Sequence, residues 1–356
     1  MSNQSQPTSR GFSIAGRSIG AGQPPYIIAE LSANHNGHLE NALKLIETAA
    51  RCGADAVKLQ TYTADTITLD HDGPDFMLTT GPWKGRRLYD LYDEAHTPWE
   101  WHAALFAKAR DCGICCFSSP FDFTAVDLLE SLGAPAYKIA SFELVDHALI
   151  ERVARTGKPV LMSRGMANAQ EIEEAVAVAR NAGCKDLLLF HCVSGYPTPP
   201  EDINLASIPD LAARFGVTVG LSDHTLGNAV ATAAVALGAA AIEKHFIMSR
   251  NDGGPDAAFS MEPDELADLV TATRTAAAAL GQPSYSLKGS EAAQASLRRS
   301  LYVVADVKAG ESLTENNIRS IRPGYGLAPK HYREVLGRRA ARDLPRGTPL
   351  SWDDLS

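Results

Sequence analysis

The sequence predicts an α/β protein, a (β/α)₈ TIM barrel followed by a small β-rich C-terminal domain. Short apolar runs, rich in β-branched residues, alternate with longer amphipathic segments, and such units indicate a parallel sheet. Eight runs are present, the number of strands in a closed barrel, at residues 26–30, 56–60, 114–118, 136–139, 159–163, 187–191, 217–222 and 241–245. Strand after strand ends in polar or ionisable residues, as expected where strand ends share one functional face. The alternative, a doubly wound open sheet, would not place polar groups at all eight ends.

The other elements of the barrel are expected in chain order. Residues 1–25 form an N-terminal extension, in which 12–20 is expected to fold as a hairpin at the bottom of the barrel. Helices are predicted at 39–51, 98–111, 123–132, 169–182 and 263–280, and the apolar residues of the first recur at helical spacing. Residues 61–95 form a long insertion after the second strand. The aromatic residues in and just after the insertion are candidates for a pocket wall, namely Trp83, Tyr89, Tyr92 and Trp99.

The pattern changes after the last predicted helix. The barrel domain is expected at 26–282, a linker at 283–296 and the small domain at 297–356, with a strand at 301–307 and a helix capped at 314–317. Between residues 297 and 346, eleven Lys/Arg stand against five Asp/Glu. A basic segment of this kind indicates either nucleic-acid binding or a cover over an anionic active site.

Composition narrows the functional class. A net charge of −9 argues against general nucleic-acid binding, and no stretch approaches the roughly 20 apolar residues of a membrane span. The polar N-terminus and the six scattered cysteines lead us to expect a cytoplasmic protein. Cys112 and Cys115 have a spacing found in zinc sites, but no second pair follows. The end of a helix leading into a buried strand explains them better.

Two lysines end otherwise apolar strands. Lys58 and Lys138 are each expected to point into the barrel mouth. Two ammonium groups on one concave face favour a site for phosphate or carboxylate groups. Extension to solvent is the alternative for a single lysine, and it is less favoured for a pair at equivalent strand ends. Hydroxyl donors are available near the same face at Ser118, Ser119, Ser141 and Ser222.

Two histidines end the last two predicted strands. Adjacent barrel strands would bring the imidazoles of His224 and His245 close enough to share a divalent metal such as Mn²⁺. The alternative is a pair of buried, hydrogen-bonded core histidines, but a pair that faces two lysines favours the metal site. His191 and His35 are weaker candidates for the same mouth.

Three carboxylates are candidates for contacts with substrate. Glu30 ends the first strand, and Glu143 lies five residues after Lys138. Either carboxylate could orient a sugar hydroxyl or transfer a proton, and the alternative for either is a salt bridge to one of the lysines. Asp256 follows the last strand in a Gly/Pro turn and could bind a polyol, cap a helix or lie in a solvated loop.

A series of motifs resembles the sialic acid synthase family. From about residue 26 onwards they are, in order, IAELSANHNG, VKLQTY, YKIAS, HCVSGYPTPPED, GLSDHT, IEKHF and GPD. The C-terminal sequence SLYVVADVKAGESLTENNIRSIRPGYGL resembles the antifreeze-like (SAF) domain of that family. The resemblance covers nearly the whole chain in one order. It implies a (β/α)₈ barrel with a C-terminal SAF domain.

The resemblance also implies a chemistry and an assembly. Members join phosphoenolpyruvate to an amino sugar in a transferase reaction that forms a carbon–carbon bond. They use a divalent metal, with Mn²⁺ favoured and Mg²⁺ or Co²⁺ as alternatives. They form a domain-swapped homodimer, in which the SAF domain of one chain covers the active site of the other.

Roles carry over by motif to individual residues. His224 and His245 bind the metal, and phosphoenolpyruvate is held by Lys58, Lys138, Ser141 and Ser222. The sugar or the reacting centre is contacted by Glu30, Glu143, Tyr196 and Asp256, with Arg322 reaching over from the partner chain. Of these, Glu30, Glu143, His224 and His245 would be catalytic. Gly195 departs from the pattern, because sialic acid synthases carry a polar side chain there.

The acceptor sugar is indicated by one segment. GRRLYDLYDEAHTPWEWH most resembles the branch of the family that uses 2,4-diacetamido-2,4,6-trideoxy-L-altrose. The alternatives within the family are N-acetylmannosamine and the legionaminic acid precursor. Outside it, the alternatives are a barrel aldolase with a Schiff base on Lys58 or Lys138, and a non-catalytic binding module. The binding module would leave the polar strand ends unexplained.

Overall fold

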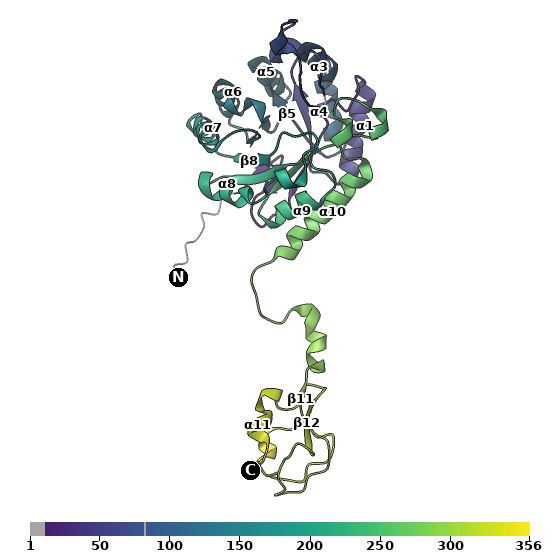
Figure 1. Ribbon diagram of the computed structural model, residues 1–356, viewed down its shortest axis with the longest axis vertical. Helices are drawn as coiled ribbons and strands as arrows, with labels where there is room; N and C mark the ends of the chain where they lie inside the picture. Colours follow the sequence, from purple (N-terminus) through teal and green to yellow (C-terminus); the bar gives the residue numbers. More distant parts are fainter. Residues whose placement is uncertain (1–10, 82) are drawn as a thin grey trace. The chain divides into compact units, whose positions relative to one another are not determined.

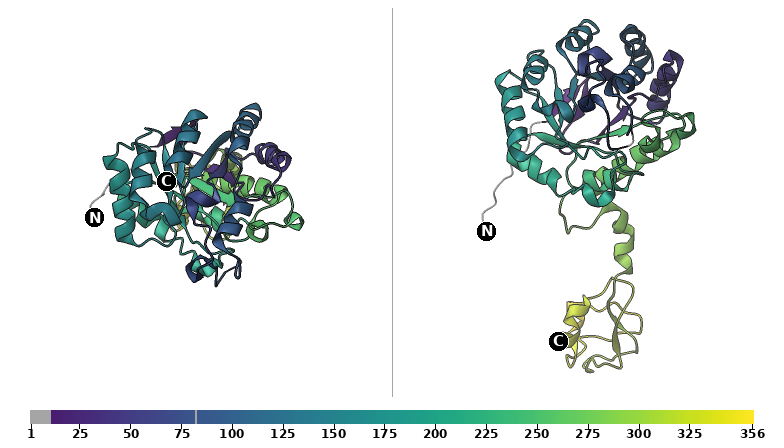
Figure 2. Two further views of the ribbon diagram at one scale, coloured as in Figure 1. Left: turned by 90° about the horizontal axis from the view of Figure 1, so that it is seen from above. Right: turned by 45° about the horizontal axis from the view of Figure 1, so that its top comes forward.

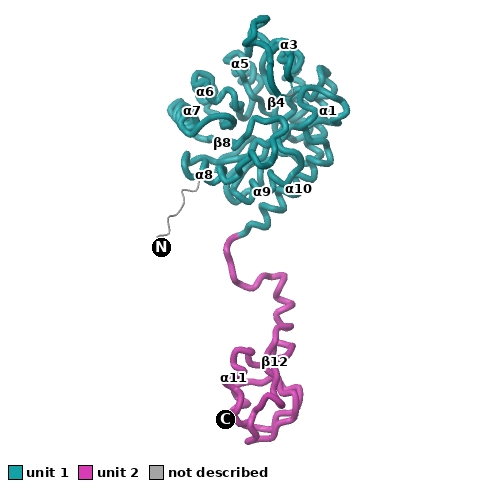
Figure 3. Tube along the Cα trace, in the orientation of Figure 1, with its two compact units in different colours: residues 1–281 teal, residues 282–356 magenta. Residues whose placement is uncertain are grey.

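The chain folds as two compact units. The computed structural model describes residues 11–81 and 83–356, so the first ten residues of the predicted N-terminal extension lie outside the described residues. Unit 1 comprises residues 1–281 and unit 2 comprises residues 282–356 (Figure 3). Each unit has apolar cores of its own and is described by itself.

Unit 1 contains a closed barrel of eight parallel strands, which confirms the predicted fold class (Figure 1). Neighbouring strands follow one another in sequence order, and the last strand pairs with the first. The predicted runs agree with the strands to within two residues at each end. The strands are β3 (Tyr26–Glu30), β4 (Ala56–Thr61), β5 (Cys115–Pro120), β6 (Tyr137–Ile139), β7 (Val160–Ser163), β8 (Leu187–Cys192), β9 (Thr218–Ser222) and β10 (Ala241–His245).

Helices surround the barrel strands (Figure 2). They are α1 (Leu39–Arg51), α4 (His102–Asp111), α5 (Phe123–Ser131), α6 (His147–Ala154), α7 (Ala169–Asn181), α8 (Ser207–Phe215), α9 (Ala229–Ala236) and α10 (Pro263–Leu280). The helix predicted at 98–111 begins as a 3₁₀ turn at Trp99–Trp101 before α4. Local sequence fixes the helix ends. The Asp122 carboxylate accepts two backbone bonds at the start of α5, and Gly216 ends α8 in the left-handed conformation.

Side chains of the barrel strands alternate between two apolar layers. In β3, Ile27 and Ala29 belong to the layer between strands and helices, whereas Tyr26 and Ile28 belong to the layer inside the barrel. This alternation follows from strand geometry, in which successive side chains point to opposite faces. Glu30, the next residue of the inward series, therefore points into the barrel at its C-terminal end.

The predicted hairpin is confirmed. β1 (Phe12–Ile14) and β2 (Arg17–Ile19) pair in antiparallel fashion, and Phe12, Ile14 and Ile19 join the apolar layer inside the barrel. Asp55, the residue before β4, connects the hairpin to the barrel. Its carboxylate accepts a hydrogen bond from the Ile27 backbone N–H, and its Oδ1 lies 3.2 Å from Arg17 Nε in β2. The hairpin thus closes the end of the barrel opposite the polar strand ends.

The insertion after β4 has its own short elements. It contains α2 (Ala64–Ile67), a 3₁₀ turn η1 (Pro74–Phe76) and α3 (Leu88–Ala95). A β-bridge between Met77 and Arg87 closes a tight loop that carries Trp83. The side chain of Arg87 forms ion pairs with Asp70, Asp72 and Asp90, which tie the two halves of the insertion together.

Unit 2 is built around one small apolar core. β11 (Ser300–Val303) pairs with β12 (Ile318–Ile321) in antiparallel fashion, between a 3₁₀ segment η7 (Gly289–Leu297) and a short helix α11 (Tyr332–Val335). The strand is shorter than the predicted 301–307. The predicted capping of a helix at 314–317 is wrong: these residues form a turn, closed by a bond from Thr314 N to the Asn317 side chain, that leads into β12.

Two sequence-level expectations bear on the class of protein. No helix among the described residues has the length and hydropathy needed to cross a membrane. Cys112 ends α4 and Cys115 begins β5, and both are free thiols. The helix-to-strand interpretation of this pair is therefore correct.

The hairpin offers a stability test. Ile14→Ala should lower the free energy of unfolding by about 2–5 kcal/mol, because it opens a cavity in the closed end of the barrel. Ser13→Ala, on the exposed face of the same strand, is the matched control and should change stability little. Urea unfolding of the intact protein followed by tryptophan fluorescence measures both. Equal stability of the two variants would show that the hairpin does not seal the barrel.

Candidate active site

The C-terminal ends of the barrel strands bring the predicted site residues together in one region, called here the barrel mouth. Strand alternation decides which side chains reach it. Counting from the apolar residues inside the barrel, the inward positions nearest the mouth are Glu30, Lys58, Gln60, Ser119, Lys138, Ser163, Cys192, Ser222, Glu243 and His245.

Four buried charges form a connected group in the mouth. Lys58 Nζ lies 2.7 Å from Glu30 Oε2 and 3.7 Å from Glu243 Oε1. Lys138 Nζ lies 3.1 Å from the same oxygen of Glu243, and the Ser222 hydroxyl donates to that oxygen at 3.0 Å. Glu243 therefore bridges the two lysines. Pairing of this kind is needed because an unpaired charge would be costly to bury.

Burial and pairing separate the two carboxyl groups. Burial raises the pKa of Glu30, although Lys58 opposes the shift. Burial acts in the same direction on Glu243, but Lys138 and Lys58 outweigh it and hold the pKa of Glu243 below its ordinary value. Burial lowers the pKa of Lys138, whereas Glu243 and Glu30 overcome burial at Lys58 and raise its pKa. Glu30 is thus the carboxyl group of this set that gains a proton more readily.

The two predicted metal ligands lie side by side. The rings of His224 and His245 have centroids 5.4 Å apart. His224 Nδ1 is 2.9 Å from the Val193 carbonyl oxygen and donates there. Its side chain also hydrogen-bonds to Cys192; burial opposes the shift, but this bond raises the pKa of His224. A metal bound at its other nitrogen would replace that bond. His245 Nδ1 is buried with no hydrogen-bond partner among the described residues. Burial lowers the pKa of His245 well below its ordinary value, which favours the neutral, metal-binding form.

A divalent metal held by the two histidines would receive only two donors from the described side chains. Within residues 11–81 and 83–356, no group of three or more His, Cys, Asp or Glu side chains is placed to hold a metal ion. His224 and His245 would therefore supply two nitrogen donors, and water and substrate oxygens would complete the shell.

A buried ion pair on the outer, helix-facing side of β10 links the two segments that carry the histidines. Lys244 points outward from β10, and its Nζ lies 3.1 Å from Asp223 Oδ2 and donates to the Thr225 carbonyl. Asp223 in turn accepts a bond from the Thr225 backbone at 2.9 Å. These three residues flank His224 and His245 in sequence. The segment that carries His224 is thereby tied to the strand that carries His245.

A chain of hydrogen bonds connects the first strand to the loop after the last. Gln60 Nε2 donates to Glu30 Oε1 at 2.9 Å and to Ser32 Oγ at 3.3 Å. The Ser32 hydroxyl donates to Asp256, whose Oδ2 lies 3.9 Å from His245 Nδ1. Burial raises the pKa of Asp256. The loop carboxylate of Asp256 thus belongs to the mouth.

Serine hydroxyls gather on the β6–β8 side of the mouth. Gly165 has no room for a side chain, because a Cβ would overlap Ser141 and lie 2.9 Å from Ser194 Oγ. The hydroxyls of Ser163 and Ser194 are buried, and neither has a hydrogen-bond partner in the described part of the chain. Buried hydroxyls without a protein partner suit a bound polar ligand. Ser141 lies beside Cys192, with Oγ and Sγ 3.5 Å apart.

Glu143 and Tyr196 occupy two further loops at the mouth. Glu143 lies in a 3₁₀ turn η3 (Phe142–Val145) after β6, and its Oε2 is buried without a hydrogen-bond partner among the residues described. Burial raises the pKa of Glu143 to about 7. The Tyr196 ring packs on His224 with centroids 4.4 Å apart and on Phe259 at 5.0 Å.

Three weaker candidates do not point into the mouth. Ser118 and His191 face outward from their strands. The Ser118 hydroxyl bonds to Thr61 at 2.6 Å, and His191 accepts from Arg164 and donates to the Ile203 carbonyl. His35 is a buried core histidine, with Nδ1 accepting from the Gly37 backbone, and burial lowers its pKa to about 4. Arg322 belongs to unit 2, so its relation to the mouth stays a prediction.

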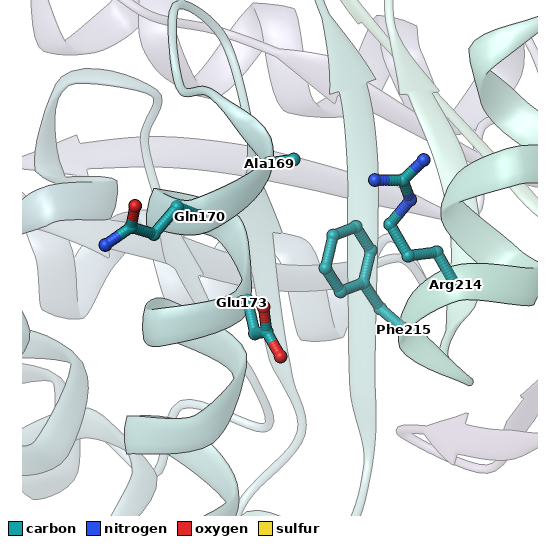
Figure 4. Close-up of a pocket in the computed structure, with 5 residues that line it drawn as sticks. All are labelled: Ala169, Gln170, Glu173, Arg214 and Phe215. Carbon is teal, nitrogen blue, oxygen red and sulfur yellow. The ribbon is translucent and has the colours of Figure 1, made fainter.

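A separate surface cleft lies between α7 and α8, in the layer of helices outside the barrel strands. It has a volume of about 500 Å³ and is lined by Ala169, Gln170, Glu173, Arg214 and Phe215 (Figure 4). Arg214 pairs with Asp210 at 3.3 Å on the helix itself. This lining has no connected set of buried polar groups, so the barrel mouth is the better candidate for chemistry.

Sequence reasoning missed several polar residues of the mouth, namely Glu243, Gln60, Ser32, Ser163 and Ser194. Glu243 was present in the motif IEKHF, and Gln60 in VKLQTY, but neither was assigned a role. Each lies two positions from an assigned residue of the same strand, His245 or Lys58. Strand alternation alone could have found both. Ser32 carried no such signal, because it follows β3 in a left-handed conformation with φ of 43°.

Known proteins resemble this chain over most of its length. Residues 45–285 match the NeuB family, and residues 298–356 match the SAF domain. The pseudaminic acid synthase of Helicobacter pylori is 47% identical over 94% of this chain and 98% of its own length. That of Campylobacter jejuni is 44% identical over 92% and 96%. The N,N'-diacetyllegionaminic acid synthase of Campylobacter jejuni is 38% identical over 89% and 96%.

A solved structure supports the same relationship. The N-acetylneuraminic acid (sialic acid) synthetase of Leptospira borgpetersenii, in complex with citrate, is 33% identical, with a TM-score of 0.72. The match covers 80% of this chain and 95% of that one.

The raised pKa of Glu143 predicts a pH-dependent stability difference. In the unfolded chain this carboxyl group titrates near 4.3, whereas in the folded protein its pKa is about 7. Ionisation therefore costs the folded state increasing free energy as pH rises between these values, up to about 3–4 kcal/mol. Glu143→Gln should gain stability relative to wild type from pH 5 to pH 8. Urea unfolding of both proteins at several pH values measures the difference, and a constant difference would show that Glu143 ionises freely.

Proposed function

The chain belongs to the NeuB family, and we propose that it joins phosphoenolpyruvate, 2,4-diacetamido-2,4,6-trideoxy-L-altrose and water to give pseudaminic acid and phosphate. The observation that carries the choice of sugar is the identity to pseudaminic acid synthases, 44–47% over more than nine-tenths of the chain. The legionaminic acid synthases are 35–38% identical, so another acceptor of this kind is the alternative.

The two lysines are suited to phosphoenolpyruvate. Lys58 and Lys138 both lie close to Glu243 Oε1, so together they can hold the phosphate and the carboxylate of one small substrate. Ser141, Ser163, Ser194 and Ser222 add hydroxyl donors on the same side. An anionic substrate competes with Glu30 for Lys58. Release from Lys58 leaves Glu30 with a raised pKa, so its carboxylate is a stronger base.

The reaction needs a new bond between C3 of phosphoenolpyruvate and the aldehyde carbon of the open-chain sugar. A divalent metal held by His224 and His245, Mn²⁺ with Mg²⁺ or Co²⁺ as alternatives, would polarise that aldehyde oxygen. Lys58 and Lys138 orient phosphoenolpyruvate so that C3 faces the aldehyde carbon, and orientation of this kind supplies a large part of a rate enhancement.

Proton transfers fall to the carboxyl groups around the bond. Glu143, with a pKa of about 7, would donate a proton to the oxygen that becomes the new hydroxyl or hold that hydroxyl. Attack leaves positive charge at C2 of the former phosphoenolpyruvate, where water adds. That water would be activated either by Glu30, which takes one of its protons, or by the metal held at the histidine pair. The C2–O bond to phosphate then breaks, a carbonyl forms at C2, and the second proton of the water leaves with the phosphate. Gln60 and Ser32 connect Glu30 to Asp256, which holds sugar hydroxyls.

The homodimer is part of the proposal. Exposed apolar side chains follow four of the barrel strands at the mouth: Phe123 after β5, Phe142 and Val145 after β6, Met166 after β7 and Leu226 after β9. Such a rim supports burial against another chain. The basic unit 2 of a partner chain, with Arg322, has the charge to cover anionic substrates. Use of phosphoenolpyruvate, a cytoplasmic metabolite, supports a cytoplasmic location.

Phosphate release tests the function directly. With Mn²⁺ and phosphoenolpyruvate, the protein should release phosphate with the altrose derivative and much more slowly with N-acetylmannosamine or the legionaminic acid precursor. A colorimetric phosphate assay across the three sugars measures this. Preference for either other sugar would retain the family and overturn the acceptor, and no release with any of them would contradict a synthase.

Replacement of one histidine tests the metal site. His245→Ala should bind Mn²⁺ at least about tenfold more weakly, because loss of a residue that only supports a metal ligand already lowers metal affinity by about that factor. The variant should also lose Mn²⁺-dependent phosphate release. Its circular dichroism spectrum should match that of the wild type. His147→Ala, an exposed histidine at the start of α6, is the matched control and should bind Mn²⁺ as the wild type does. Full Mn²⁺ binding by His245→Ala would exclude the site.

A further inference from the structure

Three of the four aromatic residues in and after the insertion have partners within the protein that account for them. The Tyr89 hydroxyl donates to Asp65, and its ring lies against Arg87. Tyr92 packs edge-on against Tyr62 with centroids 5.8 Å apart. Trp99 Nε1 donates to the Tyr62 carbonyl at 3.2 Å. These contacts hold the insertion to the barrel, so they explain the three side chains without a ligand.

Trp83 differs, because it extends an aromatic wall that starts at the histidine pair. The wall runs from His224 to the Tyr196 ring at 4.4 Å and from Tyr196 to the Trp83 ring at 5.7 Å. Phe259 packs on both Tyr196 and His245, at 5.0 Å and 4.9 Å. Trp83 therefore lies one ring farther than Tyr196 from His224.

The polar atom of Trp83 is already used. Its indole Nε1 donates to the Pro255 carbonyl at 3.1 Å, in the loop that carries Asp256. The Asn36 side chain holds the same loop from another side, with bonds to the Asp252 and Gly253 carbonyls. Because its N–H is satisfied within the protein, what the half-buried indole offers to a ligand is apolar ring surface.

We propose that Trp83 determines the sugar specificity of the enzyme by packing against the distal half of the acceptor, where the altrose derivative carries its C4 acetamido group and C6 methyl group. The inference rests on the proposed function, because it takes the aldehyde end of the sugar to lie at the histidine pair. A sugar anchored there extends along the wall towards Trp83. N-acetylmannosamine has hydroxyls at C4 and C6, and an apolar ring would desolvate them without offering a hydrogen bond.

Steady-state kinetics on three variants tests this role. Trp83→Ala should lower kcat/KM for the altrose derivative relative to N-acetylmannosamine by about 10–100-fold, the range expected for loss of apolar contacts in a pocket, through a higher KM for the altrose derivative. It should leave KM for phosphoenolpyruvate within about twofold. Trp83→Phe keeps a ring but loses the bond to Pro255, and it should retain most of the affinity for the sugar. Tyr89→Ala removes an aromatic side chain from the same insertion, and both of its KM values should match the wild type.

The outcomes separate this inference from the function on which it rests. If wild type does not turn over the altrose derivative, the proposed acceptor and the role of Trp83 both fall. If wild type does so and Trp83→Ala has unchanged KM for the sugar, only the role of Trp83 falls. Equal increases in KM for the sugar and for phosphoenolpyruvate, or a Trp83→Phe variant as impaired as Trp83→Ala, would show that Trp83 only supports the Asp256 loop.

Discussion

Closure of the barrel is the constraint on which the site depends. β10 pairs with β3, in a register that places His245 opposite Glu30. In a closed sheet every strand has two neighbours, so a shift of one residue in any strand would turn its inward side chains to the helices. The apolar layers inside and outside the barrel oppose such a shift. Convergence of Glu30, Lys58, Lys138 and Glu243 on one region is therefore a consequence of packing far from the mouth.

Bringing these four charged side chains together removes them from water, which costs free energy unless each charge is paired. Four charged side chains are buried, and each has an opposite charge within reach: Glu30 with Lys58, and Glu243 with both lysines. The group has no net charge when all four are ionised. A substrate with phosphate and carboxylate groups can replace protein carboxylates as the partner of the lysines. The two lysine ammonium groups can therefore bind an anionic substrate, and they remain paired with protein carboxylates when no substrate is bound.

The sequence predicted the barrel because its information is periodic and local. Eight apolar runs, the turn residues between them and the amphipathic helices repeat the same unit, and the inward hairpin follows from the alternation of Phe12, Ile14 and Ile19 with exposed neighbours. The paired histidines and lysines followed from strand ends. Ser118 and His191 were misplaced because strand ends were read without counting alternation. Ser32 and the contact of Trp83 with Tyr196 depend on loop conformation, which local sequence does not specify.

Some side chains of the mouth project from barrel strands and others from loops, and the two groups suit different functions. Lys58, Lys138, Glu243 and His245 project from barrel strands, whose positions are fixed by neighbours on both sides, as chemistry common to a family requires. Trp83, Tyr196 and Asp256 lie in loops, which can change in length and sequence without disturbing the strands. These loops are not free, because the indole of Trp83 and the amide of Asn36 hold the Asp256 loop from two sides. A change of acceptor sugar can therefore arise in the insertion while the phosphoenolpyruvate side stays the same.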